Sequence, residues 1–224
     1  MGEILTELTF AEWIKYNFDH PVTDPQWHWG IEMDEWHGPA DVTVAYLTRA
    51  FENARQVFRP YSDAQLAQGL DWLASTSEYM FVLRDEAVPW PDRRRCLLSM
   101  YQLYVQCFLP RCHSDYLSHG VAVAGDNPLN GVCYMWWDLL PIYGDSTAPP
   151  ASPRAEMDAV CLSVMERTLA LESEACRESA LHGLGDWGRE YPEKVSSIID
   201  AFVAQNTLSP GLLGYVDNAR RGSV

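Results

Sequence analysis

The C-terminal third of the sequence has a regular helical spacing of apolar residues, which restricts this part of the chain to packed α-helices. Ser152 and Pro153 supply an N-cap and a first-turn proline for a helix. The same spacing predicts a second helix up to Trp187, a third from Pro192 and a short last one near residues 210–220. The first of these helices has its apolar face at Met157, Val160, Cys161, Val164, Met165, Thr168 and Leu169.

The segment ALHGLGDWGREYP, residues 180–192, contains the pattern G-x-G-x-x-G that also occurs in dinucleotide-binding folds. That function requires a buried strand before Gly183 and an acidic residue ending a second strand about 20 residues later. The residues before Gly183 have only a helical apolar spacing, and residues 193–205 have the pattern of an amphipathic helix. We therefore predict that Gly183 and Gly185 permit close approach of neighbouring helices, and that Gly188 ends its helix as a left-handed cap.

The stretch ACRESALHGLGDWGREYPEKVSSIIDAFV ends one helix in the pattern A-L-x-x-L-G and starts the next at a proline followed by paired aliphatic residues. In this, residues 173–206 resemble one unit of a HEAT-type helical repeat. The resemblance implies stacked antiparallel helix hairpins with an extended face that usually binds protein partners. Residues 43–74 and 92–140 contain helix pairs of suitable length without the glycine and proline signature. The expected fold class is all-α, a helical bundle that continues into HEAT-like hairpins similar to an α-solenoid.

The chain divides into four parts by composition. An aromatic, acidic segment over residues 1–38 is expected to pack on the domain, and residues 39–143 form the main helical part. Residues 144–153 contain three prolines and are the candidate linker, and residues 154–224 are the HEAT-like hairpins. Residues 132–140 fit a strand or a helix by periodicity, and we favour a short helix because the neighbouring segments are helical. We expect the two helical parts to form one continuous unit.

The charge of the chain restricts its partners. The formal net charge is −15, from 31 acidic and 16 basic residues, which repels nucleic-acid phosphates and attracts basic proteins. No apolar run reaches the roughly 20 residues that cross a bilayer. The first residues, MGEILTELTF, lack the basic and apolar regions of a secretory signal. We therefore expect a cytoplasmic protein that binds neither nucleic acid nor membranes and carries no cofactor.

The stretch WHWGIEMDEWHG, residues 27–38, gathers tryptophan, histidine and acidic residues. Three interpretations remain open: His28 and His37 bind a metal with nearby carboxylates, the tryptophans bind a partner inside an acidic rim, or the tryptophans fold back onto the helical core. For the second interpretation the candidate partner-binding residues are Trp27, Trp29, Glu32, Asp34, Glu35 and Trp36, together with Asp186 and Glu190 of the tail.

Two other groups of titratable residues stand out. His182 and Asp186 lie one helical turn apart, which allows a hydrogen bond common in ordinary helices, so we interpret His182 as structural. Cys107, Cys112 and His113, with His119 further on, have a spacing that matches no standard zinc site. We therefore predict no metal in either group and interpret the cysteines as small buried hydrophobic residues.

These features predict a non-enzymatic binding protein whose acidic surface sequesters or inhibits a basic protein partner. A specific version is an immunity protein that occupies the active-site cleft of a bacterial toxin, its acids standing in for a polyanionic substrate. The alternative is a metal-dependent enzyme with a site at His28, His37 and nearby acids, or at Cys112 and His113. The sequence contains no G-x-S-x-G, H-E-x-x-H or Walker-type motif that would support an enzyme.

Overall fold

The computed structural model describes residues 4–5, 7–30, 35–77, 79–113, 117–120 and 127–224. These residues form eleven α-helices and one parallel pair of two-residue strands, β1 (Ile4–Leu5) and β2 (Glu35–Trp36), so the predicted all-α class is confirmed. Short 3-10 turns cover Trp27–Trp29 and Tyr79–Arg84, and π-helical turns cover Trp72–Thr76 and Tyr104–Phe108. The helices are α1 (Phe10–Phe18), α2 (Ala40–Glu52), α3 (Ala54–Val57), α4 (Asp63–Asp71), α5 (Trp90–Leu103), α6 (Leu109–Arg111), α7 (Pro128–Leu139), α8 (Pro153–Leu169), α9 (Glu174–Trp187), α10 (Pro192–Gln205) and α11 (Pro210–Arg221).

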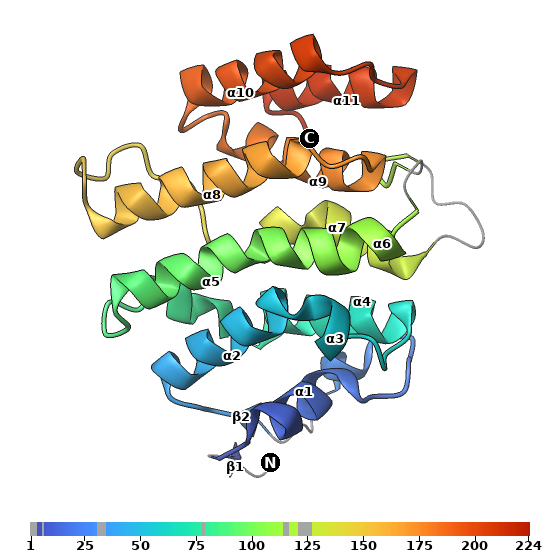
Figure 1. Cartoon of the computed structure of the whole chain (residues 1–224), viewed down its shortest axis with the longest axis vertical. Helices are drawn as coiled ribbons and strands as arrows, with labels where there is room; N and C mark the ends of the chain where they lie inside the picture. Colours follow the sequence, from blue (N-terminus) through green and yellow to red (C-terminus); the bar gives the residue numbers. More distant parts are fainter. Residues whose placement is uncertain (1–3, 6, 31–34, 78, 114–116, 121–126) are drawn as a thin grey trace.

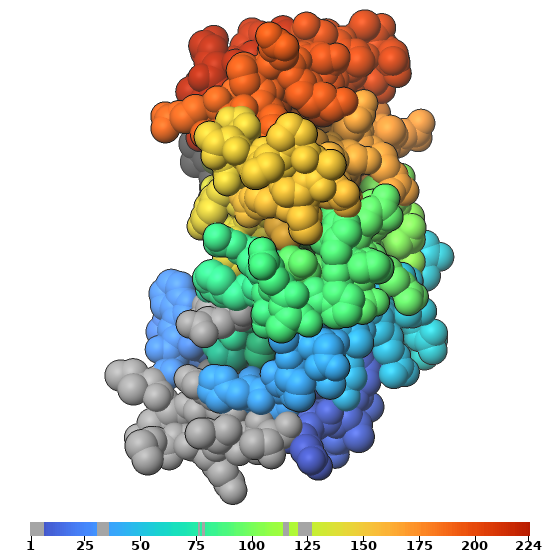
Figure 2. Space-filling model, turned by 90° about the vertical axis from the view of Figure 1, so that its left-hand side faces the viewer, coloured from blue at the N-terminus to red at the C-terminus, as the bar shows by residue number. Residues whose placement is uncertain are grey.

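The helices lie in successive layers along the longest axis of the molecule (Figure 1). α2 packs on α5 and α5 on α8, whereas α4 packs on α7 and α7 on α9. α10 and α11 cover α8 and α9 at one end, and α1 packs on α4 at the other. The space-filling view shows the same order on the surface, from blue at the N-terminal end to red at the C-terminal end (Figure 2). Because of this order, α9 lies between α7 and α11.

Helix ends follow the local sequence signals. Thr9 and Ser62 each form a complete capping box, and the side chains of Ser152 and Ser173 accept hydrogen bonds from the first turns of α8 and α9. Residues 132–140, which were open between strand and helix, belong largely to α7. None of the described helices combines the length and apolar character that a membrane crossing requires.

The buried apolar residues form one connected cluster that extends from Trp13 in α1 to Ala219 in α11. The segment 144–153 lies against this body: the Asp145 backbone N–H donates to Asp158 Oδ2 at 2.7 Å, and the Ser146 hydroxyl donates to Glu190 Oε2 at 2.7 Å. These bonds hold the connection between α7 and α8 against α8 and the α9–α10 turn.

The glycines of the G-x-G-x-x-G pattern serve helix packing at two of their three positions. A Cβ on Gly183 would lie 2.6 Å from Cγ of Trp137, and a Cβ on Gly185 would lie 2.7 Å from Cγ1 of Val224. The predicted close approach of helices is therefore confirmed. The left-handed cap predicted for Gly188 is wrong, because its φ of −61° and ψ of −26° are right-handed. Its N–H bonds the carbonyl of Gly185, so the helical turn continues through it toward Pro192.

Candidate functional site

A cluster of three titratable side chains lies between α7 and α9. His182 and Asp186 are one turn apart on α9, and Asp138 lies at the end of α7. His182 Nε2 lies 2.9 Å from Asp138 Oδ2 and 3.8 Å from Asp186 Oδ2. The ligand atoms of these three residues all lie within 4.8 Å of one another, which is the arrangement of a potential metal site. Among the described residues, this is the one group of three or more such side chains.

The orientation of the His182 ring is set by α11. Its Nδ1 lies 2.6 Å from the hydroxyl of Tyr215, which in turn donates to the hydroxyl of Tyr134 at 3.1 Å. The other ring nitrogen, Nε2, faces the Asp138 carboxyl group, so the imidazole ring is held between α11 and α7.

The two aspartates have pKa values displaced in opposite directions. Burial and the neighbouring Asp138 carboxyl raise the pKa of Asp186 to about 8. Burial also acts to raise the pKa of Asp138, but its hydrogen bonds with Asp186 and His182 outweigh burial and leave the pKa below the usual value. At neutral pH the pair therefore shares a proton that resides on Asp186, as expected for two carboxyl groups crowded into one site.

A buried carboxylate extends this network behind Tyr215. Glu178 of α9 accepts the backbone N–H groups of Ser118 and His119 at 2.7 and 2.9 Å, and its Oε1 lies 2.5 Å from Nδ1 of the His119 ring. The His119 ring stacks on Tyr215 with a centroid distance of 4.4 Å. Since three N–H groups face it, the Glu178 charge is compensated and holds residues 117–120 against α9.

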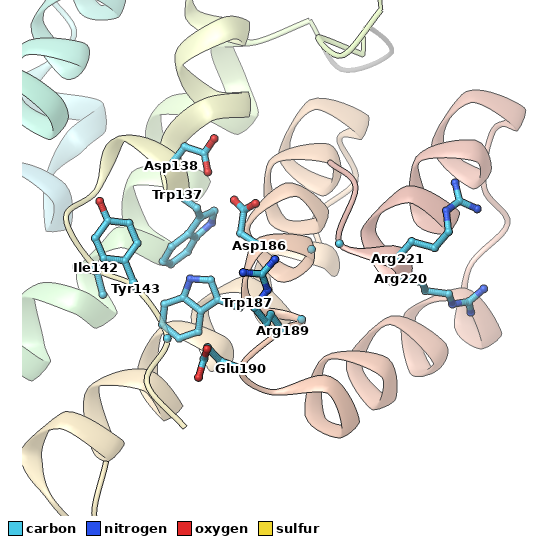
Figure 3. Close-up of a pocket in the computed structure, with 14 residues that line it drawn as sticks. Trp137, Asp138, Ile142, Tyr143, Asp186, Trp187, Arg189, Glu190, Arg220 and Arg221 are labelled. Carbon is cyan, nitrogen blue, oxygen red and sulfur yellow. The ribbon is translucent and has the colours of Figure 1, made fainter. Parts of the chain in front are cut away.

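The Asp138–His182–Asp186 cluster borders a cavity of about 640 Å³ (Figure 3). The cavity lies between the end of α7, the α9–α10 turn and the C-terminal end of α11. Figure 3 shows that Arg220 and Arg221 extend away from Asp138 and Asp186. Arg220 also pairs with Asp200 at 2.6 Å, which neutralises it. The lining comprises Trp137, Asp138, Ile142, Tyr143, Gly144, Gly185, Asp186, Trp187, Gly188, Arg189, Glu190, Arg220, Arg221 and Gly222.

The candidate partner-binding residues predicted from the sequence separate into two places. Asp186 and Glu190 both line this cavity. The turn Trp27–Trp29 contacts Trp72, directly after α4, through Trp27, and Trp36 contacts Trp13 of α1, so this segment packs on the N-terminal helices and not on α9. The structure therefore brings the two tail residues together and keeps the tryptophan segment apart from them.

Within the N-terminal segment each tryptophan has a different environment. Trp36 is buried in the core against Trp13, so its ring offers no surface for a partner. Trp27 is half-buried and stacks on His20, with ring centroids 3.6 Å apart. Trp29 is 65% exposed and remains available for a contact. Glu32 and Asp34 lie outside the described residues, and Glu35 belongs to β2.

The structure also shows where the histidines and cysteines that the alternative function would use as metal ligands lie. His28 is buried, and its Nε2 lies 3.3 Å from Asp71 Oδ2 and 2.5 Å from Gln26 Oε1. Neither His28 nor His37 belongs to the three-residue cluster found among the described residues. Cys107 and Cys112 are buried and His113 is exposed, and none of the three belongs to that cluster. The geometry suited to a metal ion therefore lies at Asp138, His182 and Asp186.

Three residues of the site were missed by sequence reasoning: Asp138, Glu178 and Tyr215. Asp138 is the single acidic residue in the run VCYMWWDLL, and Glu178 lies on the buried side of α9. A charged residue inside an apolar helix pattern is a signal for a paired or functional group, because an unpaired buried charge is costly. That signal marks the residues but does not reveal which helices meet around them.

Comparisons of the chain with models of known protein families, with curated proteins and with solved structures found no match.

Proposed function

We propose that this chain is a non-enzymatic protein-binding protein that sequesters or inhibits a basic partner. The observation that carries the proposal is the cavity wall, where the Glu190 carboxylate, the Asp186 carboxyl group and the 64% exposed ring of Tyr143 line the same cavity. Carboxylates beside an aromatic ring suit an arginine or lysine side chain, which gains charge-assisted hydrogen bonds and a cation–π contact.

The layered architecture supports the same proposal. The pairs α5 and α7, α8 and α9, and α10 and α11 follow one another along the molecule, and we interpret them as HEAT-like hairpins of an α-solenoid. Such stacks present extended faces to which partners bind. The net charge of −15 adds long-range attraction for a basic protein and raises its association rate.

A specific version of the proposal is an immunity protein for a bacterial toxin. Its partner would be a toxin whose active-site cleft is basic because it accepts a polyanionic substrate. Glu190 and the Tyr143 ring at the cavity would then dock on that cleft and block substrate entry.

Coexpression with the product of the neighbouring gene, followed by titration calorimetry at low and high salt, tests the proposal. We expect a one-to-one complex that weakens at high salt, because exposed charges are screened. Glu190→Gln and Tyr143→Ala should each weaken binding by about 1 kcal/mol or more, about fivefold in Kd. Asp41→Asn, an exposed change on α2, is the matched control and should bind normally. If no basic protein binds at low salt, or if Glu190→Gln and Tyr143→Ala bind as tightly as the control, the proposal is wrong.

A further inference from the structure

Three potential metal-ligand atoms converge at the edge of the cavity. Asp138 and Asp186 contribute carboxyl oxygens, and His182 contributes Nε2, since its Nδ1 faces Tyr215. These ligand atoms all lie within 4.8 Å of one another. The side chain of His182 is only 6% exposed, so packing fixes the imidazole in its place beside the two carboxyl groups.

We infer that Asp138, His182 and Asp186 form a binding site for a divalent transition-metal ion, with Zn²⁺ as the best fit. One imidazole and two carboxylates are ligands that zinc accepts, whereas Mg²⁺ and Ca²⁺ prefer oxygen alone. This inference goes beyond the proposed partner binding and does not depend on it.

The observed separations suit a tetrahedral centre. Zinc bonds to nitrogen and oxygen are about 2.0–2.2 Å long, which places tetrahedral ligand atoms about 3.4 Å apart. The distances from His182 Nε2 to Asp138 Oδ2 and Asp186 Oδ2, 2.9 and 3.8 Å, lie on either side of this value. Small rotations of two side chains that are 36% and 43% exposed would equalise them.

The surroundings of the cluster match those of metal sites with an open position. The Tyr215 hydroxyl lies 2.6 Å from Nδ1 of His182, on the side of the ring opposite the ligand atom, where an outer hydrogen bond orients the histidine in such sites. Asp138 and Asp186 line the cavity, so an ion can enter from it. Three protein ligands leave a fourth position for water or for a ligand group held in the cavity.

The test uses the full-length protein after removal of metal with a chelator. Calorimetric titration with ZnCl₂ at physiological ionic strength, which screens loose binding to the acidic surface, should give one tight site per chain. Asp186→Asn and Asp138→Asn should weaken that site by more than about 100-fold, and Tyr215→Phe by about tenfold. Asp41→Asn keeps the same net charge as the aspartate variants and should leave the affinity unchanged. Far-ultraviolet circular dichroism of each variant checks that it folds.

A Co²⁺-loaded sample gives a second readout. Four-coordinate Co²⁺ has intense visible absorption bands, and we expect them in the wild type and in Asp41→Asn but not in Asp186→Asn. The inference is overturned if the wild-type chain lacks a tight Zn²⁺ site, or if folded Asp186→Asn binds Zn²⁺ as tightly as Asp41→Asn. It is also overturned if Co²⁺ gives only weak six-coordinate bands. Asp138→Asn should lose Zn²⁺ binding with partner binding intact, and Glu190→Gln should lose partner affinity with Zn²⁺ binding intact, which separates this inference from the proposed function.

Discussion

The buried carboxyl groups of Asp158 and Glu178 accept hydrogen bonds from donors outside their own helices. The Glu178 carboxylate lies within α9 and is fully buried, yet two backbone N–H groups and the ring of His119 surround it. Such a carboxylate contributes to stability only while these donors are present, because removal of either side leaves a buried polar group without a partner. Glu178 therefore connects α9 to residues 117–120, and the His119 ring of this segment stacks on Tyr215 of α11.

Replacement of Glu178 should destabilise the fold. Glu178→Ala leaves the N–H groups of Ser118 and His119 without an acceptor, and we expect a loss of about 3 kcal/mol in the free energy of unfolding. Glu178→Gln keeps one acceptor oxygen and should lose less. Urea unfolding followed by circular dichroism measures both, with Glu166→Gln, exposed on α8, expected within about 0.5 kcal/mol of the wild type. A Glu178→Ala protein as stable as this control would contradict the role assigned to Glu178.

The cysteine thiols should react only when the chain unfolds. All six cysteines are free and buried, and burial raises the pKa of Cys96 and of Cys107 to about 12. Since the thiolate is the reactive form, both access and ionisation oppose reaction in the folded protein. A disulfide reagent at mildly alkaline pH should label the native protein slowly, and should label six thiols at once in concentrated guanidinium chloride. Rapid labelling of the native protein at Cys96 or Cys107 would contradict this expectation.

At the scale of the element, α9 is the helix on which the site depends. It is buried on nearly every side because α7, α8, α10 and α11 all pack against it. Gly183 and Gly185 remove the side chains that would separate it from Trp137 of α7 and from Val224 beyond α11. This close approach brings Asp138 and Tyr215 to opposite sides of the His182 ring.

Alanine substitutions of glycine test this packing directly. Gly183→Ala places a Cβ 2.6 Å from the Trp137 ring, so α7 and α9 must separate, and we expect a loss of about 1–3 kcal/mol in stability. Gly214→Ala in α11 is the matched control: a Cβ there meets no atom within 4 Å, and the helix should gain up to about 1 kcal/mol. Thermal unfolding of both variants measures the difference. Equal effects of the two substitutions would show that the glycines of α9 do not govern packing.

At the scale of the whole molecule, the helix layers share one core. The connected cluster of buried apolar residues crosses every layer, and segment 144–153 is hydrogen-bonded to α8 and to the α9–α10 turn. Layers joined in this way gain most of their stability from contacts with neighbouring layers, since a single helix pair buries too little apolar surface alone.

We therefore expect one cooperative unfolding transition. Tryptophans lie in the core of the N-terminal layers, at Trp13 and Trp36, and in the central layers, at Trp136 and Trp137. Urea curves from tryptophan fluorescence and from circular dichroism at the helix band should coincide. Two separate transitions, or curves that differ between the probes, would mean that the N-terminal and C-terminal layers unfold independently.

The sequence alone determined the all-α class, the four C-terminal helices with most of their ends, and the packing role of Gly183 and Gly185. Caps, first-turn prolines and apolar spacing act within a few residues, so they are readable without the fold. Gly188 was misjudged because its conformation depends on the short turn into α10. Only the tertiary structure decided the site, since Asp138, His182 and Tyr215 come from three helices and Trp36 is buried by neighbours distant in the chain. Contacts between distant residues depend on how whole helices pack, and no local pattern specifies that packing.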